Sequence, residues 1–126
     1  MVHMLCEQNI VLEVCPTSNL HTGVVRELSR HPLADLVHLG IQITLNTDDP
    51  SVSDTTLTDE VVVSVRQIGL AKHQIYRALR HSVEASFLPP EEKDALRERI
   101  RTALDRYPEA VAAFESANGA GSPSAA

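Results

Sequence analysis

The sequence predicts an α/β fold in which parallel strands are joined by helical crossovers. Two short apolar runs, Ile10–Cys15 and Ile41–Leu45, are rich in β-branched residues, which is typical of parallel strands buried on both faces. A helical pattern separates the two runs, and further helical patterns follow the second run. This order predicts two parallel strands and about five helices.

The first expected strand, Ile10–Cys15, follows a segment (residues 1–8) with the pattern of a helix end. Glu13 interrupts its apolar run, and we expect this carboxylate to face a polar pocket or a neighbouring loop, because a buried charge needs partners. Pro16 is expected to end the strand, and residues 17–19 to form a polar loop with local capping capacity.

A loop with Gly23 and a short helical turn lead to His31-Pro32, where proline suits the first position of a helix. Gly40 stands where a left-handed helix cap belongs. The second expected strand, Ile41–Leu45, follows at once and alternates in character. One face is apolar, and the other carries Gln42, Thr44, Asn46 and, if the extended backbone continues, Asp48.

The rest of the chain is expected to be helical. Valines at 61–65 favour a strand, but Thr58-Asp59-Glu60 suits a helix N-terminus, so we predict a helix over residues 55–68 that ends at Gly69. Helices are also predicted over residues 72–85, where His73 and His81 are expected to be solvated, and from Pro89 to about Arg106. A further turn is expected after Tyr107-Pro108, and residues 118–126 are small and polar and are expected to be disordered.

The composition excludes several classes of protein. The net charge of −6 and the aromatic content of 3% do not suit a nucleic-acid-binding surface. No apolar run approaches the roughly 20 residues of a membrane span, so no membrane association is expected. Cys6 and Cys15 are too few for a disulfide framework and are expected to be small buried apolar residues in a reduced, cytoplasmic protein.

The most informative stretch is Asn46–Pro50, where Asp48 and Asp49 follow the second strand directly. Aspartates at the carboxyl end of a parallel strand are placed as metal ligands and acid–base groups are in α/β enzymes. The residues alone also allow a simpler interpretation, because Asp-Asp-Pro is common turn and helix-capping chemistry.

Four stretches carry a resemblance to a known family. They are LEVCPTSNLHTG (Leu12–Gly23), HPLADLVHLGIQITLNTDDP (His31–Pro50), TTLTDE (Thr55–Glu60) and ASFL (Ala85–Leu88). Together they resemble the C-terminal part of the adenosine deaminase family, whose members are zinc-dependent (β/α)8 barrels of the TIM type that convert adenosine to inosine and ammonia. The resemblance implies that residues 1–107 are the C-terminal part of such a barrel, with residues 108–126 a terminal turn and tail.

By the same resemblance, Asp48 is the aspartate that ligates Zn2+ and orients its water, and Asp49 hydrogen-bonds the purine of a nucleoside substrate. The two strands become the last two of the barrel. The family's His-x-His pair is absent, and its other zinc histidine, catalytic glutamate and second catalytic histidine lie before the CPTSN motif. We therefore identify no catalytic residue in this chain.

These departures lead us to expect a C-terminal fragment that supplies half of a site, since a complete barrel takes roughly 250 residues. We expect the fragment to be inactive alone and prone to self-association through its open strand edges. Two alternatives stay open: an inactive remnant or interaction fragment, and an enzyme that acts on adenine instead of adenosine.

Overall fold

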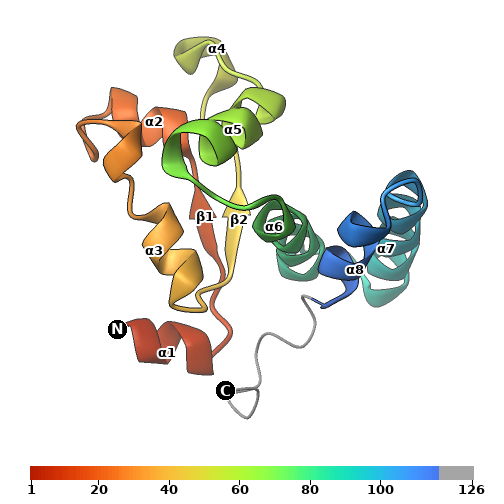
Figure 1. Ribbon diagram of the computed structural model, residues 1–126. Helices are drawn as coiled ribbons and strands as arrows, with labels where there is room; N and C mark the ends of the chain where they lie inside the picture. The colour runs from red at the N-terminus through yellow and green to blue at the C-terminus, as the bar shows by residue number, and fades with distance from the viewer. Residues whose placement is uncertain (117–126) are drawn as a thin grey trace.

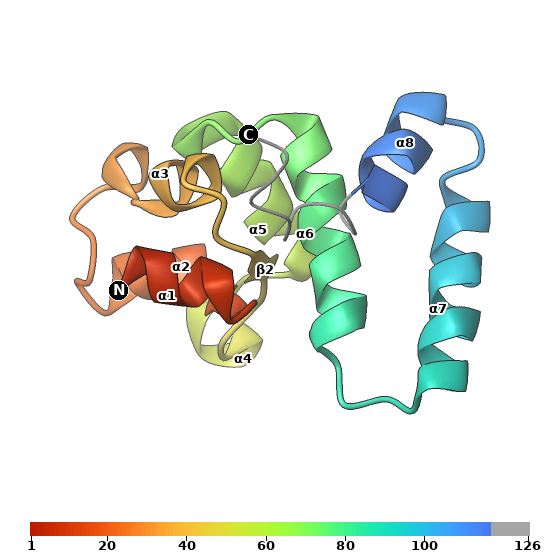
Figure 2. The ribbon, with the colours of Figure 1, turned by 90° about the horizontal axis from the view of Figure 1, so that it is seen from below.

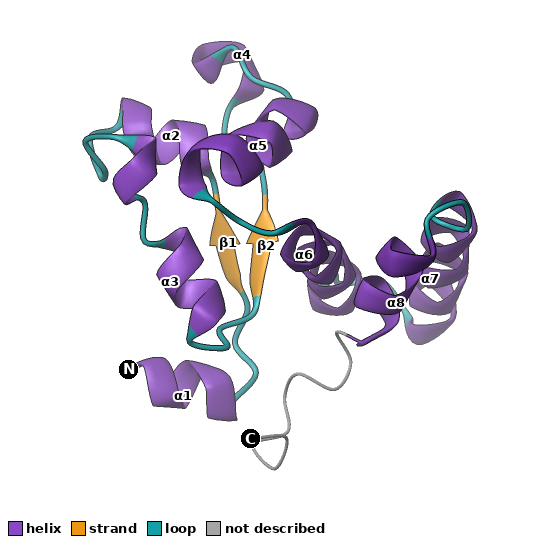
Figure 3. Cartoon of the chain, viewed as in Figure 1, coloured by secondary structure: helices purple, strands orange, loops and turns teal. Residues whose placement is uncertain are grey.

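The computed structural model describes residues 1–116 and shows two strands and eight α-helices (Figures 1 and 3). A 3-10 helix, η1, and a π-helix, η2, complete the secondary structure. In chain order the elements are α1 (Val2–Glu7), β1 (Leu12–Val14), α2 (Pro16–His21), η1 (Leu28–Arg30), α3 (Leu33–His38), β2 (Ile43–Leu45), α4 (Pro50–Ser53), α5 (Leu57–Val63), η2 (Ser64–Ile68), α6 (Lys72–Ala85), α7 (Pro90–Ala103) and α8 (Pro108–Ser116).

The two strands pair in parallel, with Leu12 opposite Ile43 and Val14 opposite Leu45. This confirms the α/β class and the pair of parallel strands. Helix α3 lies beside the sheet on the β1 side and α6 on the β2 side (Figure 1). The main core gathers around β2 and is made of Val14, Leu28, Leu33, Ile41, Ile43, Leu45, Ile68, Leu70 and Ala78. The sheet therefore anchors the packing although each strand is short.

The structure has eight α-helices in the described residues where about five were expected, and two of the additional ones are short segments that follow the strands. Residues 17–19 form the first turn of α2, where Pro16 has the backbone angle that a helix start needs. Residues 50–53 form α4, which Asp49 caps. Glu13 was expected to face a polar pocket or a neighbouring loop, and the structure shows it exposed.

The valine-rich segment is a helix, as expected. The side chain of Thr56 accepts a hydrogen bond from the Asp59 N–H, and Asp59 accepts one from the Thr56 N–H, so the two residues form a capping box at the start of α5. The helix continues into the π-helical turn η2 and ends at Gly69, whose φ of 95° is left-handed. The capping box outweighs the strand preference of the valines.

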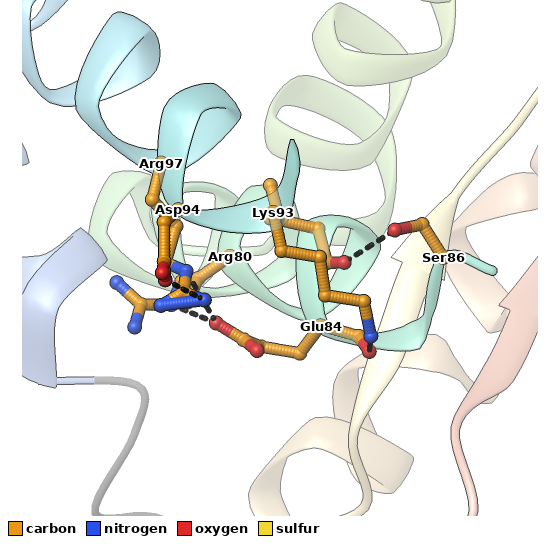
Figure 4. A network of polar contacts seen from close by, with 7 residues as sticks. Arg80, Glu84, Ser86, Lys93, Asp94 and Arg97 are labelled. Carbon is orange, nitrogen blue, oxygen red and sulfur yellow. Dashed lines mark hydrogen bonds and ion pairs between the residues drawn. The ribbon is translucent and has the colours of Figure 1, made fainter. Parts of the chain in front are cut away.

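Helices α6, α7 and α8 pack together, with α6 and α7 running side by side (Figure 2). The buried side chain of Arg80 pairs with Glu84 at 2.7 Å and lies 5.1 Å from the ring centre of Phe114 in α8. From α7, Arg97 contacts the same carboxylate at 3.3 Å, and Lys93 donates to the Glu84 carbonyl at 2.6 Å (Figure 4).

The expected turn after Pro108 is a full helix, α8. The expected disorder of residues 118–126 falls outside the described residues.

Within residues 1–116, no helix has both the length and the apolar character that crossing a membrane requires.

Two buried histidines, His31 and His81, make the stability of the fold depend on pH. His81 in α6 donates from Nδ1 to the Ile43 carbonyl at 3.2 Å, and its Nε2 is buried and has no partner in the described part of the chain. Burial lowers the pKa of His31 and of His81, and Arg77 adds to the effect at His81. His81 was expected to be solvated, and its burial reflects contact with a strand that lies far away in sequence.

We expect acidification to destabilise the fold. In the unfolded chain both histidines take up a proton near pH 6.5, whereas in the folded chain they stay neutral to lower pH, so stability falls as pH drops below about 6.5. The melting temperature, followed by circular dichroism between about pH 7.5 and 5.5, should fall. His81→Asn keeps a donor for Ile43 and should weaken this dependence. The exposed-site control His73→Gln should leave it unchanged, and equal profiles for both variants would refute the assignment.

Candidate functional site

The candidate site lies at the carboxyl end of the two strands. Asp48 and Asp49 follow β2, and α2 begins directly after β1. Because the strands are parallel, these segments meet at the same edge of the sheet, together with α4 and α5 (Figure 1). The structure therefore brings the aspartate pair next to the CPTSN segment, which lies about thirty residues earlier in the sequence.

Asp48 is exposed and oriented by one hydrogen bond. Its Oδ2 accepts from Ser18 Oγ at 2.9 Å. Its Oδ1 receives no hydrogen bond from the described residues. The carboxylate is thus held at one oxygen and open at the other.

Asp49 has a different role in the fold. Its backbone is extended (φ −122°, ψ 95°), as expected for a residue before proline. Its Oδ1 accepts from the N–H groups of Ser51 and Val52, both at 3.1 Å, and so caps α4. The simple capping interpretation therefore applies to Asp49, but it uses only one of the two carboxylate oxygens.

Glu60 was missed as part of this region. It is 1% exposed, and both of its oxygens accept hydrogen bonds: Oε2 from the Thr17 N–H at 3.1 Å and Oε1 from Thr55 Oγ1 at 3.0 Å. It therefore ties α5 to the first turn of α2. The available signal was a glutamate directly before the apolar run of valines, because a carboxylate in that position must find partners.

His31 anchors the other side of the same turn. Its Nδ1 accepts from the Leu33 N–H at 3.0 Å, so the proton lies on Nε2, which donates to Asn19 Oδ1 at 3.0 Å. His31 was expected to begin a helix, and it lies just before α3. Its contact with Asn19 could not be read from the local sequence.

Cys15 directly precedes α2 and is partly buried. Burial raises the pKa of its thiol first, and the negative charges of Asp48, Glu60 and Glu13 raise it further. The group therefore stays a neutral thiol at neutral pH, which suits a small packed residue and not a nucleophile or a thiolate ligand.

A metal ion bound at this edge of the sheet would need several ligand side chains close together. In the described part of the chain, no three His, Cys, Asp or Glu side chains lie close enough together to hold one. Asp48 fits as a single oxygen ligand, because it is exposed with Oδ1 open. These residues offer one ligand, so a metal at this edge needs others from elsewhere.

An apolar groove of about 430 Å³ runs beside β2 toward this edge. Leu45 of β2 and Asn46 just after the strand line it, and side chains of α5 and α6 line its other walls. The strand order β1-β2 leaves this side of β2 without a neighbouring strand in the described residues.

Comparison with known proteins gives one consistent result. Residues 1–103 match the family model described as Adenosine deaminase. The adenosine deaminase of Escherichia coli strain K12 is 41% identical over 100 residues, which cover 79% of this chain and 30% of that enzyme. The adenosine deaminase of Shigella flexneri serotype 5b matches to the same extent.

Solved structures agree with the sequence matches. The crystal structure of Arabidopsis ADAL complexed with IMP has a TM-score of 0.75 at 30% identity, and the apo structure of the N6-methyl-AMP deaminase from Arabidopsis thaliana has a TM-score of 0.75 at 31% identity. Each alignment covers 83% of this chain and 31% of the other. The chain thus spans less than a third of the relatives that it matches, and it belongs to the adenosine deaminase family.

Proposed function

We propose that this chain supplies one wall of a deaminase site in which water replaces the 6-amino group of a purine nucleoside and ammonia leaves. The observation that carries the proposal is the aspartate pair at the carboxyl end of β2, with Asp48 held by Ser18 and open at Oδ1. Family membership supports the reaction class. Adenosine is the first candidate substrate, because the relatives from Escherichia coli and Shigella flexneri bear that name.

In this proposal Asp48 is one ligand of a Zn2+ ion whose other ligands come from segments that the described residues do not contain. Zinc in such a site supplies activated water near neutral pH. The part of this chain is to present Oδ1 of Asp48 at a fixed place, because Oδ2 is engaged by Ser18.

Asp49 is proposed to contact the purine. The cap of α4 fixes its Oδ1, so Oδ2 is the oxygen available for the substrate. Such an oxygen accepts a hydrogen bond when ionised, or donates one to a ring nitrogen when protonated. Adjacent aspartates thus serve different groups, because one is turned to Ser18 and the other to the start of α4.

The groove beside β2 is the proposed place where the remaining barrel joins. The edge of β2 that faces away from β1 has no neighbouring strand in the described residues, although its Ile43 carbonyl already accepts from His81 Nδ1. Leu57 and Leu79 border the groove and are 55% and 37% exposed. This edge suits a further parallel strand with apolar side chains, and pairing with a second copy of the chain is the alternative occupant.

A nucleotide is the second candidate substrate. One matching structure is a complex with IMP and the other is an N6-methyl-AMP deaminase. Their sequence identities to this chain are 30% and 31%. Assays with adenosine, adenine and N6-methyl-AMP therefore decide among nucleoside, base and nucleotide.

The chain on its own is expected to be inactive. With Zn2+ and adenosine, the 126-residue protein should give no ammonia above the uncatalysed rate, because one ligand does not hold a catalytic zinc. Association of two copies does not change this, since each supplies the same residues. A coupled ammonia assay over a range of protein concentrations measures it, and robust turnover would refute the proposed division of the site.

A further inference from the structure

Three consecutive residues at the start of α2 each have an anchor or a target in another segment. The Thr17 N–H donates to Glu60, the Ser18 hydroxyl donates to Asp48, and the Asn19 side chain accepts from His31. The sequence separations of these pairs are 43, 30 and 12 residues. None of the contacts is thus a local feature of a short helix.

The two outer anchors are buried and the central contact is not. Glu60 is 1% exposed and His31 is 7% exposed. In contrast, the Ser18–Asp48 hydrogen bond lies in an exposed setting. An exposed hydrogen bond adds little to the free energy of folding. Stability alone therefore does not explain why the residues on either side of Ser18, Thr17 and Asn19, are both held by buried partners.

We infer that the first turn of α2 is a bracket that positions Asp48, with Ser18 as the positioning residue and Glu60 as its main support. By donating to Oδ2, the Ser18 hydroxyl favours one rotamer of Asp48 and leaves Oδ1 without a hydrogen bond from the described residues. The inference goes beyond the proposed function and rests on it only for the use to which Asp48 is put. Neither Ser18 nor Glu60 has to contact the metal or the purine.

The proposed bracket differs from a simple link between α2 and the segment after β2 in what it requires of Ser18. A simple link requires only that some contact joins the two segments. A bracket requires a hydroxyl at position 18 that is held in place beside Asp48. Removal of the hydroxyl should therefore free Asp48 while the chain stays folded. Loss of the Glu60 carboxylate should loosen the turn itself, which the hydrogen exchange of the Thr17 amide reports.

The test is the side-chain rotamer of Asp48 in the whole chain, measured by NMR from its three-bond couplings. The wild type and Ser18→Thr, which keeps the hydroxyl, should show a single rotamer, and Ser18→Ala should show averaging. Thr22→Ala is the matched control, because it removes a hydroxyl of the same region that donates to the Ser18 carbonyl and not to Asp48. Melting temperatures should stay close to wild type in all three variants.

A single Asp48 rotamer in Ser18→Ala, or equal averaging in Thr22→Ala, would overturn the inference. This measurement uses neither zinc nor turnover, so its failure is separate from a failure of the proposed function. In an active chimaera that carries this chain, Ser18→Ala should lower kcat about 10–100-fold, the range seen when the partner of a metal ligand is lost. Ser18→Thr should restore it, and failure of Thr to restore activity would also count against the bracket.

Discussion

Replacement of Asp48 by alanine is expected to abolish deamination in a complete barrel that carries this chain. A suitable host is the Escherichia coli adenosine deaminase with its matching segment, 30% of the enzyme, exchanged for this one. Losing the hydrogen-bond partner of a metal ligand lowers activity by about 10–100-fold, and losing the ligand itself should lower it further. We therefore expect kcat/KM to fall by more than about a hundredfold. Steady-state turnover of adenosine measures the effect.

The neighbouring aspartate provides the control. Asp49→Asn keeps the cap of α4, because the asparagine oxygen still accepts from the Ser51 and Val52 N–H groups. It alters the contact proposed for the purine, so it should raise the KM for adenosine. The zinc content of the chimaera should stay unchanged. Similar turnover in Asp48→Ala and in the unaltered chimaera would refute the ligand role.

Replacement of Glu60 by alanine is expected to give a large loss of stability. It leaves the Thr17 N–H without an acceptor, leaves the Thr55 hydroxyl only its 3.3 Å contact with the Thr56 carbonyl, and opens a cavity at a site that is 1% exposed. Each of these effects is costly, and together they should lower the free energy of unfolding by about 2–4 kcal/mol. Urea unfolding measures the change through the midpoint at constant slope.

Two further variants make this result specific. Glu60→Gln keeps one acceptor oxygen and most of the volume, so its loss should be smaller than that of alanine. Glu92→Ala removes an exposed glutamate at the start of α7 and should change stability by no more than about 0.5 kcal/mol. A Glu60→Ala variant as stable as Glu92→Ala would contradict the clamp between α5 and α2.

Local patterns predicted much of the fold. The two parallel strands, the left-handed turn at Gly40 with a φ of 84°, the helix end at Gly69, and helices α6 and α7 follow from residues close in sequence. The aspartate pair was also recognised in the sequence, and its place at the strand end is confirmed.

What could not be predicted depends on partners far along the chain. Residues 17–19 read as a loop because their helix is supported by Glu60, 43 residues beyond Thr17. His81 read as solvated because its partner, the Ile43 carbonyl, lies 38 residues away. Ser18 read as a loop residue for the same reason, since its hydrogen bond to Asp48 exists only once both strands have paired.

The most direct test of the proposed role is the zinc content of the chimaera. After dialysis against a limiting zinc buffer, atomic absorption should give about one zinc per chain for the unaltered chimaera and for Asp49→Asn. It should give far less for Asp48→Ala. Full zinc occupancy in Asp48→Ala, at the same buffered zinc concentration, would contradict the claim that this chain contributes a metal ligand to a deaminase site.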